Sequence, residues 1–400
     1  MQRGGSDVAG PWRWLRLAIG AACAASASLT VIPAPTSDLW KLGLGATEWG
    51  HLLAALALTP LLPGWRRSWA GRLGAVLGLL GAGMAIVPLL RALGMAGQVP
   101  AQVGAAFGLA RPRAAPDAPA RPGGLSLVDL VRGIHSPAVA QSTVTFSGRS
   151  GHPLAMDLYH SLAAPSQLQP GPAPCVITIH GGSWQTGTRA DLPALNRYLA
   201  ARGYVVAALE YRMGPDARFP AAADDVHAAI AYLKEHARDL QLDATRLALL
   251  GRSAGGQLAL LTAYTPPDPA IRGVVSLYGP ADLVYGYTHP TNPAVLNTPE
   301  VLEAYLGGSP ATLPAAYAAA SPVNFVGPTT PPTLLIHGDR DALVSVQHSI
   351  QLDARLAGAG RPHFLLRMPW ADHGCDVNLS GPCGQLATYT IERFLAAVLQ

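Results

Sequence analysis

The feature that most constrains this chain of 400 residues is a serine set among glycines, Gly-Arg-Ser-Ala-Gly-Gly at residues 251–256. The apolar run before it, residues 246–250, is typical of a strand, and residues 257–264 are typical of a helix. A serine at such a junction matches the sharp turn that exposes a nucleophile, where glycines avoid collisions with the neighbouring strand and helix. The helix N-terminus also stabilises negative charge that develops beside Ser253. Because the chain contains 43 glycines, the pattern alone also fits an ordinary turn of small residues.

A second glycine motif, His-Gly-Gly-Ser-Trp at residues 180–184, lies upstream of the serine. It follows residues 175–179, an apolar run that predicts a buried strand. Glycines have no Cβ, so the N–H groups of Gly181 and Gly182 can point into a site. Together with the N–H of Ala254 they predict an oxyanion hole, which stabilises a tetrahedral intermediate. The alternative is a Gly-Gly turn after a strand.

The candidate acid is Asp341. Residues 333–337 predict a strand, and Asp341 lies in the turn that leaves its carboxyl end. Catalytic groups of open α/β sheets gather at those ends. Asp339, in the same turn, is the competing candidate, and its alternative role is to cap the turn through its own backbone.

The candidate base is His373, in the loop that follows the predicted strand at residues 363–368. A neutral imidazole can take the serine proton and return it to the leaving group, and an aspartate would hold it in the required tautomer. The chain has 12 histidines. His337 and His363 lie within or at the edge of predicted strands, where a structural role is expected.

These motifs resemble the esterase/lipase branch of the α/β-hydrolase superfamily. The likeness is closest to the group with an HGGxW oxyanion loop, which includes bacterial carboxylesterases, hormone-sensitive-lipase-like enzymes, kynurenine formamidases and plant prenylcysteine methylesterases. Residues 210–226 resemble the family's YR…FP…DV segment, and residues 337–344 resemble HGxxDxxV, whose aspartate matches Asp341. The resemblance covers about residues 140–400. Arg252 departs from the acidic or small residue that many relatives carry there, which bears on substrate charge.

The order of elements predicts an α/β-hydrolase fold over residues 141–400. Strand-like and helix-like runs alternate, which predicts a mostly parallel sheet of about eight strands with helices on both faces. Residues 282–330 are rich in Pro and Tyr and are expected to form an insert that shapes the substrate pocket. Trp184 and Tyr285 are candidate pocket residues, and a packing role for each stays open. The predicted strands cover residues 144–146, 154–159, 176–180, 205–211, 247–250, 273–278, 333–337 and 364–368.

The first 95 residues predict a membrane region with about three transmembrane helices. Only 13% of the chain is charged, against about 25% in a typical soluble domain. Three stretches without charge, residues 17–37, 49–65 and 73–90, each approach the ~20 residues that span a bilayer. The alternative is a signal peptide followed by buried helices, because residues 21–28 are small and follow two arginines.

Basic residues predict the orientation of this region. Arginines precede the first stretch and separate the second from the third, so the N-terminus is expected in the cytoplasm and the catalytic domain outside the inner membrane. Arginines after the third stretch argue against this orientation. Residues 96–140 are predicted to be a linker, with a short apolar helix at residues 103–109. The arginines used here are Arg3, Arg13, Arg16, Arg66, Arg67 and Arg72, opposed by Arg91, Arg111, Arg113 and Arg121.

The cysteines and the charge balance limit the other possible functions. Cys375 and Cys383 bracket a short loop after His373, and either a disulfide in an oxidising compartment or two free thiols fits that spacing. No Cys and His spacing is typical of a metal site. No phosphate loop or dinucleotide motif occurs, and a net charge of +4 gives no case for nucleic acid. The sequence thus predicts no cofactor and no metal, and it does not predict the oligomeric state.

The function predicted from these observations is a membrane-anchored serine hydrolase that cleaves a small-molecule carboxylic ester through an acyl-enzyme. An amidase, formamidase or peptidase with the same triad is the alternative. Family peptidases usually carry a large N-terminal propeller, which this sequence lacks. A non-catalytic interaction protein with the same fold is a third possibility, although all three triad residues are present. The sequence does not identify the substrate.

Overall fold

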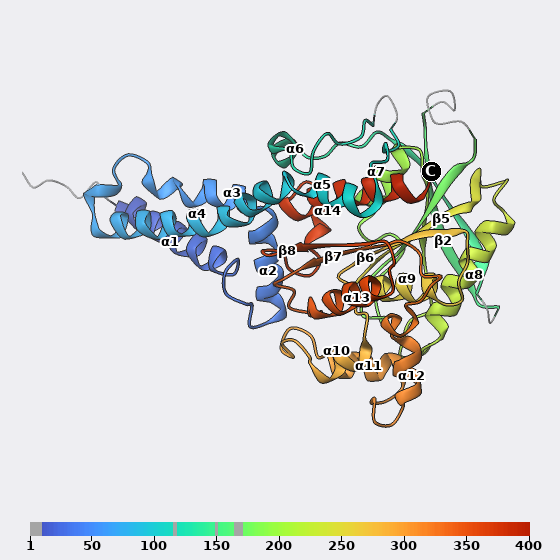
Figure 1. Ribbon diagram of the computed structural model, residues 1–400. Coiled ribbons are helices and arrows are strands. Elements are labelled where there is room, and N and C mark those ends of the chain that lie inside the picture. Colours follow the sequence, from blue (N-terminus) through green and yellow to red (C-terminus); the bar gives the residue numbers. More distant parts are fainter. Residues whose placement is uncertain (1–9, 115–117, 149–150, 164–170) are drawn as a thin grey trace, which may run out of the picture.

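The computed structural model describes residues 10–114, 118–148, 151–163 and 171–400. A helical N-terminal region projects from a sheet domain that holds the rest of the chain (Figure 1). Arg3, one of the arginines used to predict orientation, lies outside the described residues. The projecting region contains α1 (Gly10–Ser28), α2 (Ser37–Glu48), α3 (Gly50–Ala57) and α4 (Trp69–Ala96), with 3-10 turns η1 (Thr59–Leu61) and η2 (Trp65–Arg67) between α3 and α4.

Eight strands of the described residues form one sheet in the order β1-β2-β4-β3-β5-β6-β7-β8. The pairs β1–β2 and β2–β4 are antiparallel, and every other pair is parallel. The predicted eight-stranded, mostly parallel sheet is therefore confirmed. The strands are β1 (Val139–Ser147), β2 (Pro153–Ser161), β3 (Ala173–Ile179), β4 (Val205–Leu209), β5 (Leu242–Arg252), β6 (Ile271–Leu277), β7 (Thr333–Gly338) and β8 (His363–Met368).

Helices cover both faces of the sheet, because its central strands are apolar on both faces. In β4, for example, Val205, Ala207 and Leu209 belong to one core and Val206 and Ala208 to the other. The helices α8 (Ala221–Glu235), α9 (Ala254–Tyr264) and α13 (Gln347–Gly358) pack on the first core. The helices α7 (Pro193–Ala201) and α14 (Pro382–Val398) pack on the second (Figure 1).

The N-terminal helices pack through small residues. A Cβ on Gly20 of α1 would collide with the carbonyl oxygen of Gly74 in α4, and one on Gly78 would collide with that of Ala57 in α3. Large apolar side chains instead face outward, and Leu79 and Leu80 of α4 are 52% and 58% exposed. Close backbone approach through glycine and alanine is typical of helices that pack within a bilayer.

The lengths of the N-terminal helices can be compared with the prediction of about three transmembrane helices. Among the described residues, only α4 is long and apolar enough to cross a membrane, by length and composition alone. The second predicted stretch, residues 49–65, is broken into α3 and two 3-10 turns because Pro60, Pro63 and Gly64 interrupt the helix. At 1.5 Å per residue the eight residues of α3 span only about 12 Å. In α1, the apolar part follows Arg13 and Arg16 and is likewise short.

Part of the predicted linker is folded onto the sheet domain. The helix α5 (Val99–Phe107) buries Val99 and Val103, and the ring of Phe107 meets that of Phe394 on α14 edge to face, with centroids 4.8 Å apart. A second short helix, α6 (Leu127–Arg132), follows. Residues 96–140 therefore include packed structure, because the apolar face of α5 finds a partner on α14.

Candidate active site

Ser253 occupies a strained turn between β5 and α9, at the carboxyl edge of the sheet. Its backbone has φ 55° and ψ −122°, a region that residues with a Cβ rarely adopt. A Cβ on Gly251 would collide with the carbonyl oxygen of Gly255, and one on Gly255 would collide with that of Ile179 in β3. Glycine is thus required on both sides of the serine, as the motif predicts.

Ser253, His373 and Asp341 lie in hydrogen-bonding contact, although they come from three segments that are distant in the sequence. His373 Nε2 is 3.0 Å from Ser253 Oγ, and His373 Nδ1 is 2.7 Å from Asp341 Oδ2. The residues follow β5, β8 and β7, so the parallel strands bring their carboxyl ends together. Asp341 and His373 are 8% and 6% exposed, which shields their contact from water.

Asp341 is held in its ionised form by its partners. Its Oδ1 accepts hydrogen bonds from the backbone N–H groups of Leu343 (2.9 Å) and Val344 (2.7 Å). Burial alone would raise the pKa of Asp341, but His373 and His337 lower it below its usual value. The competing Asp339 accepts a hydrogen bond from Arg367 Nε at 2.5 Å and makes no hydrogen bond with His373.

The glycine loop after β3 lies against Ser253. A Cβ on Gly181 would be 3.1 Å from Ser253 Cβ, and Gly182 has a φ of 111°, which favours glycine. The ring of His180 stacks on Tyr211 with centroids 4.3 Å apart, and the Tyr211 hydroxyl donates to the His180 carbonyl at 3.0 Å. These contacts fix the loop beside the serine. Gly181 and Gly182 line one cavity at Ser253, and Ala254, the next residue in the chain, lines another.

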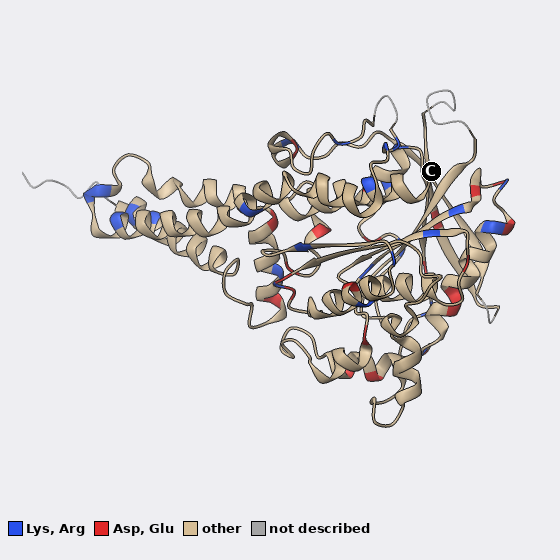
Figure 2. Ribbon diagram, viewed as in Figure 1, with Lys and Arg blue, Asp and Glu red and all other residues tan. Residues whose placement is uncertain are grey.

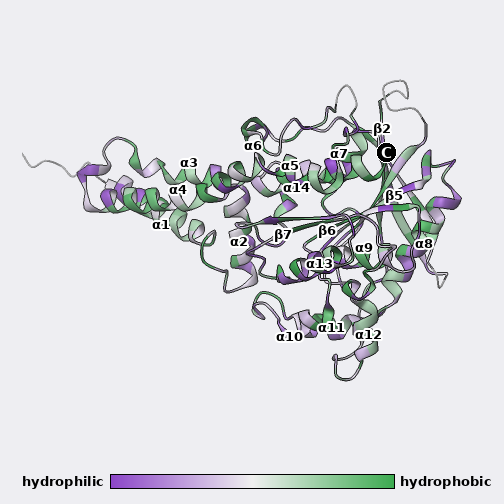
Figure 3. Ribbon diagram, in the orientation of Figure 1, coloured by the Kyte–Doolittle hydropathy of each residue, from purple (hydrophilic) through white to green (hydrophobic). Residues whose placement is uncertain are grey.

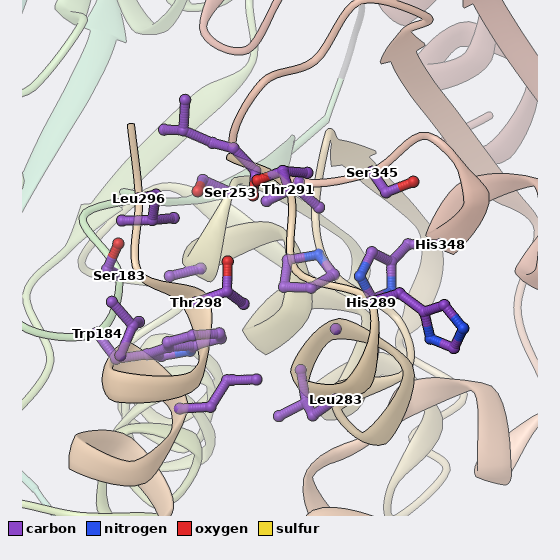
Figure 4. Close-up of a pocket in the computed structure, with 17 residues that line it drawn as sticks. Ser183, Trp184, Ser253, Leu283, His289, Thr291, Leu296, Thr298, Ser345 and His348 are labelled. Carbon is purple, nitrogen blue, oxygen red and sulfur yellow. Dashed lines mark hydrogen bonds between the residues drawn. The ribbon is translucent and has the colours of Figure 1, made fainter. Parts of the chain in front are cut away.

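Two cavities meet at Ser253 and differ in character. One is a narrow pocket of about 40 Å³ without an Asp, Glu, Lys or Arg in its lining (Figure 4). The other is a wider cleft of about 360 Å³ on the side of His373. The pocket is lined mainly by Trp184, Leu283, Leu296, Val301, Leu302 and His348, and the cleft by His180, Asp191, Arg252, Tyr278 and His373.

The two predicted pocket residues have different positions. Trp184 lines the narrow pocket, stacks on Tyr305 with centroids 4.3 Å apart and donates from Nε1 to Gln257 at 2.9 Å. It thus serves both the pocket and the core. Tyr285 is absent from the lining and instead packs against His289 and His348, which do line it.

The predicted insert supplies much of the narrow pocket, including Gly286, Thr291 and Thr298. Burial lowers the pKa of the pocket residue His348 to about 3, so that side chain is neutral. The insert contains α10 (Leu283–Thr288), α11 (Thr298–Leu306), α12 (Pro314–Ala320) and the 3-10 turn η4 (Pro322–Phe325).

A buried polar network next to His373 was not predicted from the sequence. Asp376, in the 3-10 turn η5 (Cys375–Val377), accepts a hydrogen bond from Arg252 Nε at 2.5 Å and another from the Tyr278 hydroxyl. The Tyr278 ring contacts that of His373, with centroids 4.4 Å apart. Asp376 therefore neutralises the positive charge of Arg252, which weakens the expected influence of that arginine on substrate charge.

Cys375 and Cys383 form a disulfide with Cα atoms 5.7 Å apart, so the loop that follows His373 is closed covalently. Cys23 and Cys175 are free and buried. Within the described ranges, no group of three or more His, Cys, Asp or Glu side chains is arranged to hold a metal ion.

Comparison with known proteins agrees with this geometry. The family model BD-FAE matches residues 156–356, and a probable carboxylic ester hydrolase of Mycobacterium tuberculosis, LipM, is 30% identical over 390 residues, 90% of this chain and 86% of LipM. The chain belongs to the α/β-hydrolase esterase/lipase family. Esterase LipC of the same organism is 31% identical over 243 residues, 57% of this chain and 59% of LipC. This family member is an ester-hydrolysing serine hydrolase.

Solved structures show the same fold. The carboxylesterase EstE1, cloned from a metagenomic library, has a TM-score of 0.58 at 20% identity and covers 77% of this chain and 98% of its own. A bacterial heroin esterase has a TM-score of 0.58 at 22% identity, with coverage of 67% and 86%. At these identities the likeness concerns the fold alone.

Proposed function

We propose that Ser253, His373 and Asp341 are the catalytic triad of this ester hydrolase. The observation that carries the proposal is the unbroken contact from Ser253 Oγ to His373 and on to Asp341, at 3.0 and 2.7 Å. Asp341 holds the imidazole with Nε2 free to accept the serine proton. Gly181, Gly182 and Ala254 supply the N–H groups of the oxyanion hole.

The reaction proceeds in two steps. Ser253 Oγ attacks the ester carbonyl carbon while His373 Nε2 takes its proton, and the bond to the alcohol oxygen breaks as His373 returns that proton to it. Water then gives a proton to His373, attacks the acyl-serine ester and releases the acid, and Ser253 regains its proton.

We assign the acyl group to the narrow pocket and the alcohol to the wider cleft. The leaving alcohol must receive its proton from His373, which lines the cleft and not the pocket. The lining of the pocket by Trp184, Leu283 and Val301 suits an apolar acyl chain. Its volume of about 40 Å³ favours a short one.

We also propose that the N-terminal region anchors the enzyme in a membrane, with the catalytic domain outside the cytoplasm. The 28 residues of α4 extend about 42 Å, enough for a hydrocarbon core of about 30 Å. Arginines gather at the far tip of the region (Figure 2), and much of the ribbon of its helices is green, the colour of hydrophobic residues (Figure 3). Trp14 and Trp69 also meet at this tip, with rings 5.7 Å apart. Basic residues at one end are typical of the cytoplasmic side, and tryptophans are typical of either membrane interface.

The triad is tested by replacing Ser253 with Ala in the full chain. We expect hydrolysis of p-nitrophenyl acetate to fall by roughly 10⁴–10⁶, and labelling by a fluorophosphonate probe to disappear. Ser142→Ala, on an exposed position of β1, is the matched control. Turnover retained by Ser253→Ala would refute the assignment.

A matched panel of esters, anilides and formamides separates an esterase from an amidase. A topology reporter fused after residue 122 tests the proposed orientation in the membrane.

A further inference from the structure

One face of α2 lies along the loop that carries His373. Trp40, Leu44 and Glu48 are spaced four residues apart and therefore share a side of the helix. Trp40 Nε1 donates to Asp372 Oδ1 at 3.2 Å, and a Cβ on Gly374 would be 3.8 Å from Leu44 Cδ2. In Figure 1, α2 lies where the projecting helices meet the ends of β7 and β8.

The C-terminal end of α2 contacts the same loop further along. Asn378 Nδ2 donates to the Glu48 carbonyl at 3.2 Å, and the Cys383 N–H donates to Glu48 Oε2 at 3.4 Å. The Cys375–Cys383 disulfide closes the segment that these bonds reach. The loop is thus held along its length by a helix that precedes it by more than 300 residues.

Asp372 links this helix to the triad. One oxygen, Oδ1, accepts three N–H groups: that of Trp40, the backbone N–H of Ala342 at 2.9 Å and the backbone N–H of His373 at 2.7 Å. Ala342 follows Asp341, so the same carboxylate oxygen ties together the backbones that carry the acid and the base. The orientation of Asp372 therefore affects the distance between Asp341 and His373.

Hydrogen-bond donors stabilise the ionised form of Asp372, which its surroundings otherwise disfavour. Burial, and then the negative charge of Asp341, raise the pKa of Asp372 to about 6. Hydrogen bonds to a carboxylate favour its charged form. Among the described contacts, the Trp40 indole is the one side-chain donor to Asp372 Oδ1, and it comes from outside the sheet domain.

We propose that Trp40 is a positioning residue for the reaction: through Asp372 it fixes the backbones of Ala342 and His373, so that α2 completes the frame of the active site. The region that contains α4 is then part of the catalytic apparatus as well as an anchor. This inference rests on the proposed triad.

The test compares Trp40→Phe with wild type in the full chain, solubilised in detergent, with rates divided by the number of sites that a fluorophosphonate labels. Loss of one hydrogen bond is expected to lower kcat about threefold to tenfold and to leave KM for p-nitrophenyl acetate unchanged. Trp12→Phe is the matched control, because Trp12 on α1 is 66% exposed. Dividing by labelled sites removes any effect of misfolded protein.

A double-mutant cycle separates positioning from general stability. If Trp40 acts through Asp372, Trp40→Phe should have no further effect on kcat in an Asp372→Ala background, whereas Asp372→Asn, which keeps an acceptor oxygen, should retain the sensitivity. Unchanged kcat in Trp40→Phe, or independent effects in the cycle, would overturn the inference. Turnover retained by Ser253→Ala would instead refute the proposed triad, and this result is distinguishable from a failure of the Trp40 inference alone.

Discussion

The N-terminal helices and the sheet domain bury opposite kinds of residue. In the sheet domain, the core consists of large side chains such as Ile177, Leu249 and Phe394, which are fully buried. In the N-terminal region, the buried positions of α4 are mostly glycine and alanine, and leucines point outward. The core of the sheet domain is stabilised because folding removes apolar side chains from water. The N-terminal helices, with leucines on the outside and small residues between them, have the arrangement that suits contact with lipid tails.

The two regions also treat buried carboxyl groups differently. Asp341 accepts hydrogen bonds from His373 and two backbone N–H groups, and its pKa is lowered. Glu48, at the end of α2, has no exposed surface, and its Oε1 has no hydrogen-bond partner in the described structure. Burial raises the pKa of Glu48 well above its usual value. The carboxyl group beside His373 is thus charged, whereas the one at the contact between the two regions is neutral.

The largest expected effect comes from Asp341→Asn, which keeps the shape of the side chain but removes the charge that holds the His373 tautomer. We expect kcat for p-nitrophenyl acetate to fall by roughly 10³–10⁴. Asp339→Asn is the matched control, since Asp339 bonds to Arg367 at the surface. Equal losses in the two variants would contradict the assignment of Asp341 as the acid.

The prediction of intermediate size tests whether α4 faces lipid while the sheet domain faces water. Leu80 on α4 and Leu127 on α6 are 58% and 55% exposed, so aspartate at each changes a similar surface. In a bilayer, Leu80→Asp should cost about 2.5–3.5 kcal/mol of insertion free energy, whereas Leu127→Asp should change stability by about 0.5 kcal/mol or less. Membrane fractionation of both variants measures this. If Leu80→Asp stays in the membrane fraction to the same extent as Leu127→Asp, α4 does not face lipid.

Local sequence patterns predicted the strands and the turn around Ser253 because each depends on neighbouring residues. The turn around Ser253 needs Gly251 and Gly255, and the order of strands then brings Asp341 and His373 to the same edge. The break in the second stretch is also encoded locally, by Pro60, Pro63 and Gly64, which the absence of charge does not reveal. The absence of charge thus marks three stretches, whereas among the described helices only α4 is long and apolar enough to cross a membrane.

Contacts between distant segments could not be predicted in the same way. Nothing near Trp40 indicates that its indole meets Asp372, 332 residues away. The partners of Arg252 were missed for the same reason, because Tyr278 and Asp376 come from separate elements. The position of Asp372, next to His373, was the one available signal of a supporting role. Such pairs follow from the packing of the two regions, which one sequence does not reveal.

The smallest expected effect tests the neutral carboxyl at the contact between the regions. Because the pKa of Glu48 is higher in the folded state than its ordinary value of 4.5, the contribution of Glu48 to stability is most favourable below about that pH. This contribution is lost as the pH rises, because the unfolded chain can then ionise Glu48. Glu48→Gln keeps the shape and an acceptor but cannot ionise, so the variant should gain stability over wild type as the pH rises from 4.5 to 8.

Thermal unfolding in detergent at several pH values measures this gain. We expect a rise of a few degrees in Tm at pH 8, since about 1 kcal/mol corresponds to roughly 2–4 °C in a domain of 150–250 residues. Asp38→Asn, on the exposed side of α2, is the matched control and should show no such trend, because its side chain is 90% exposed. A Glu48→Gln variant less stable than wild type at pH 8 would mean that Glu48 is charged in the folded protein. The contact between the regions would then contain a buried carboxylate, and the contrast with Asp341 would not hold.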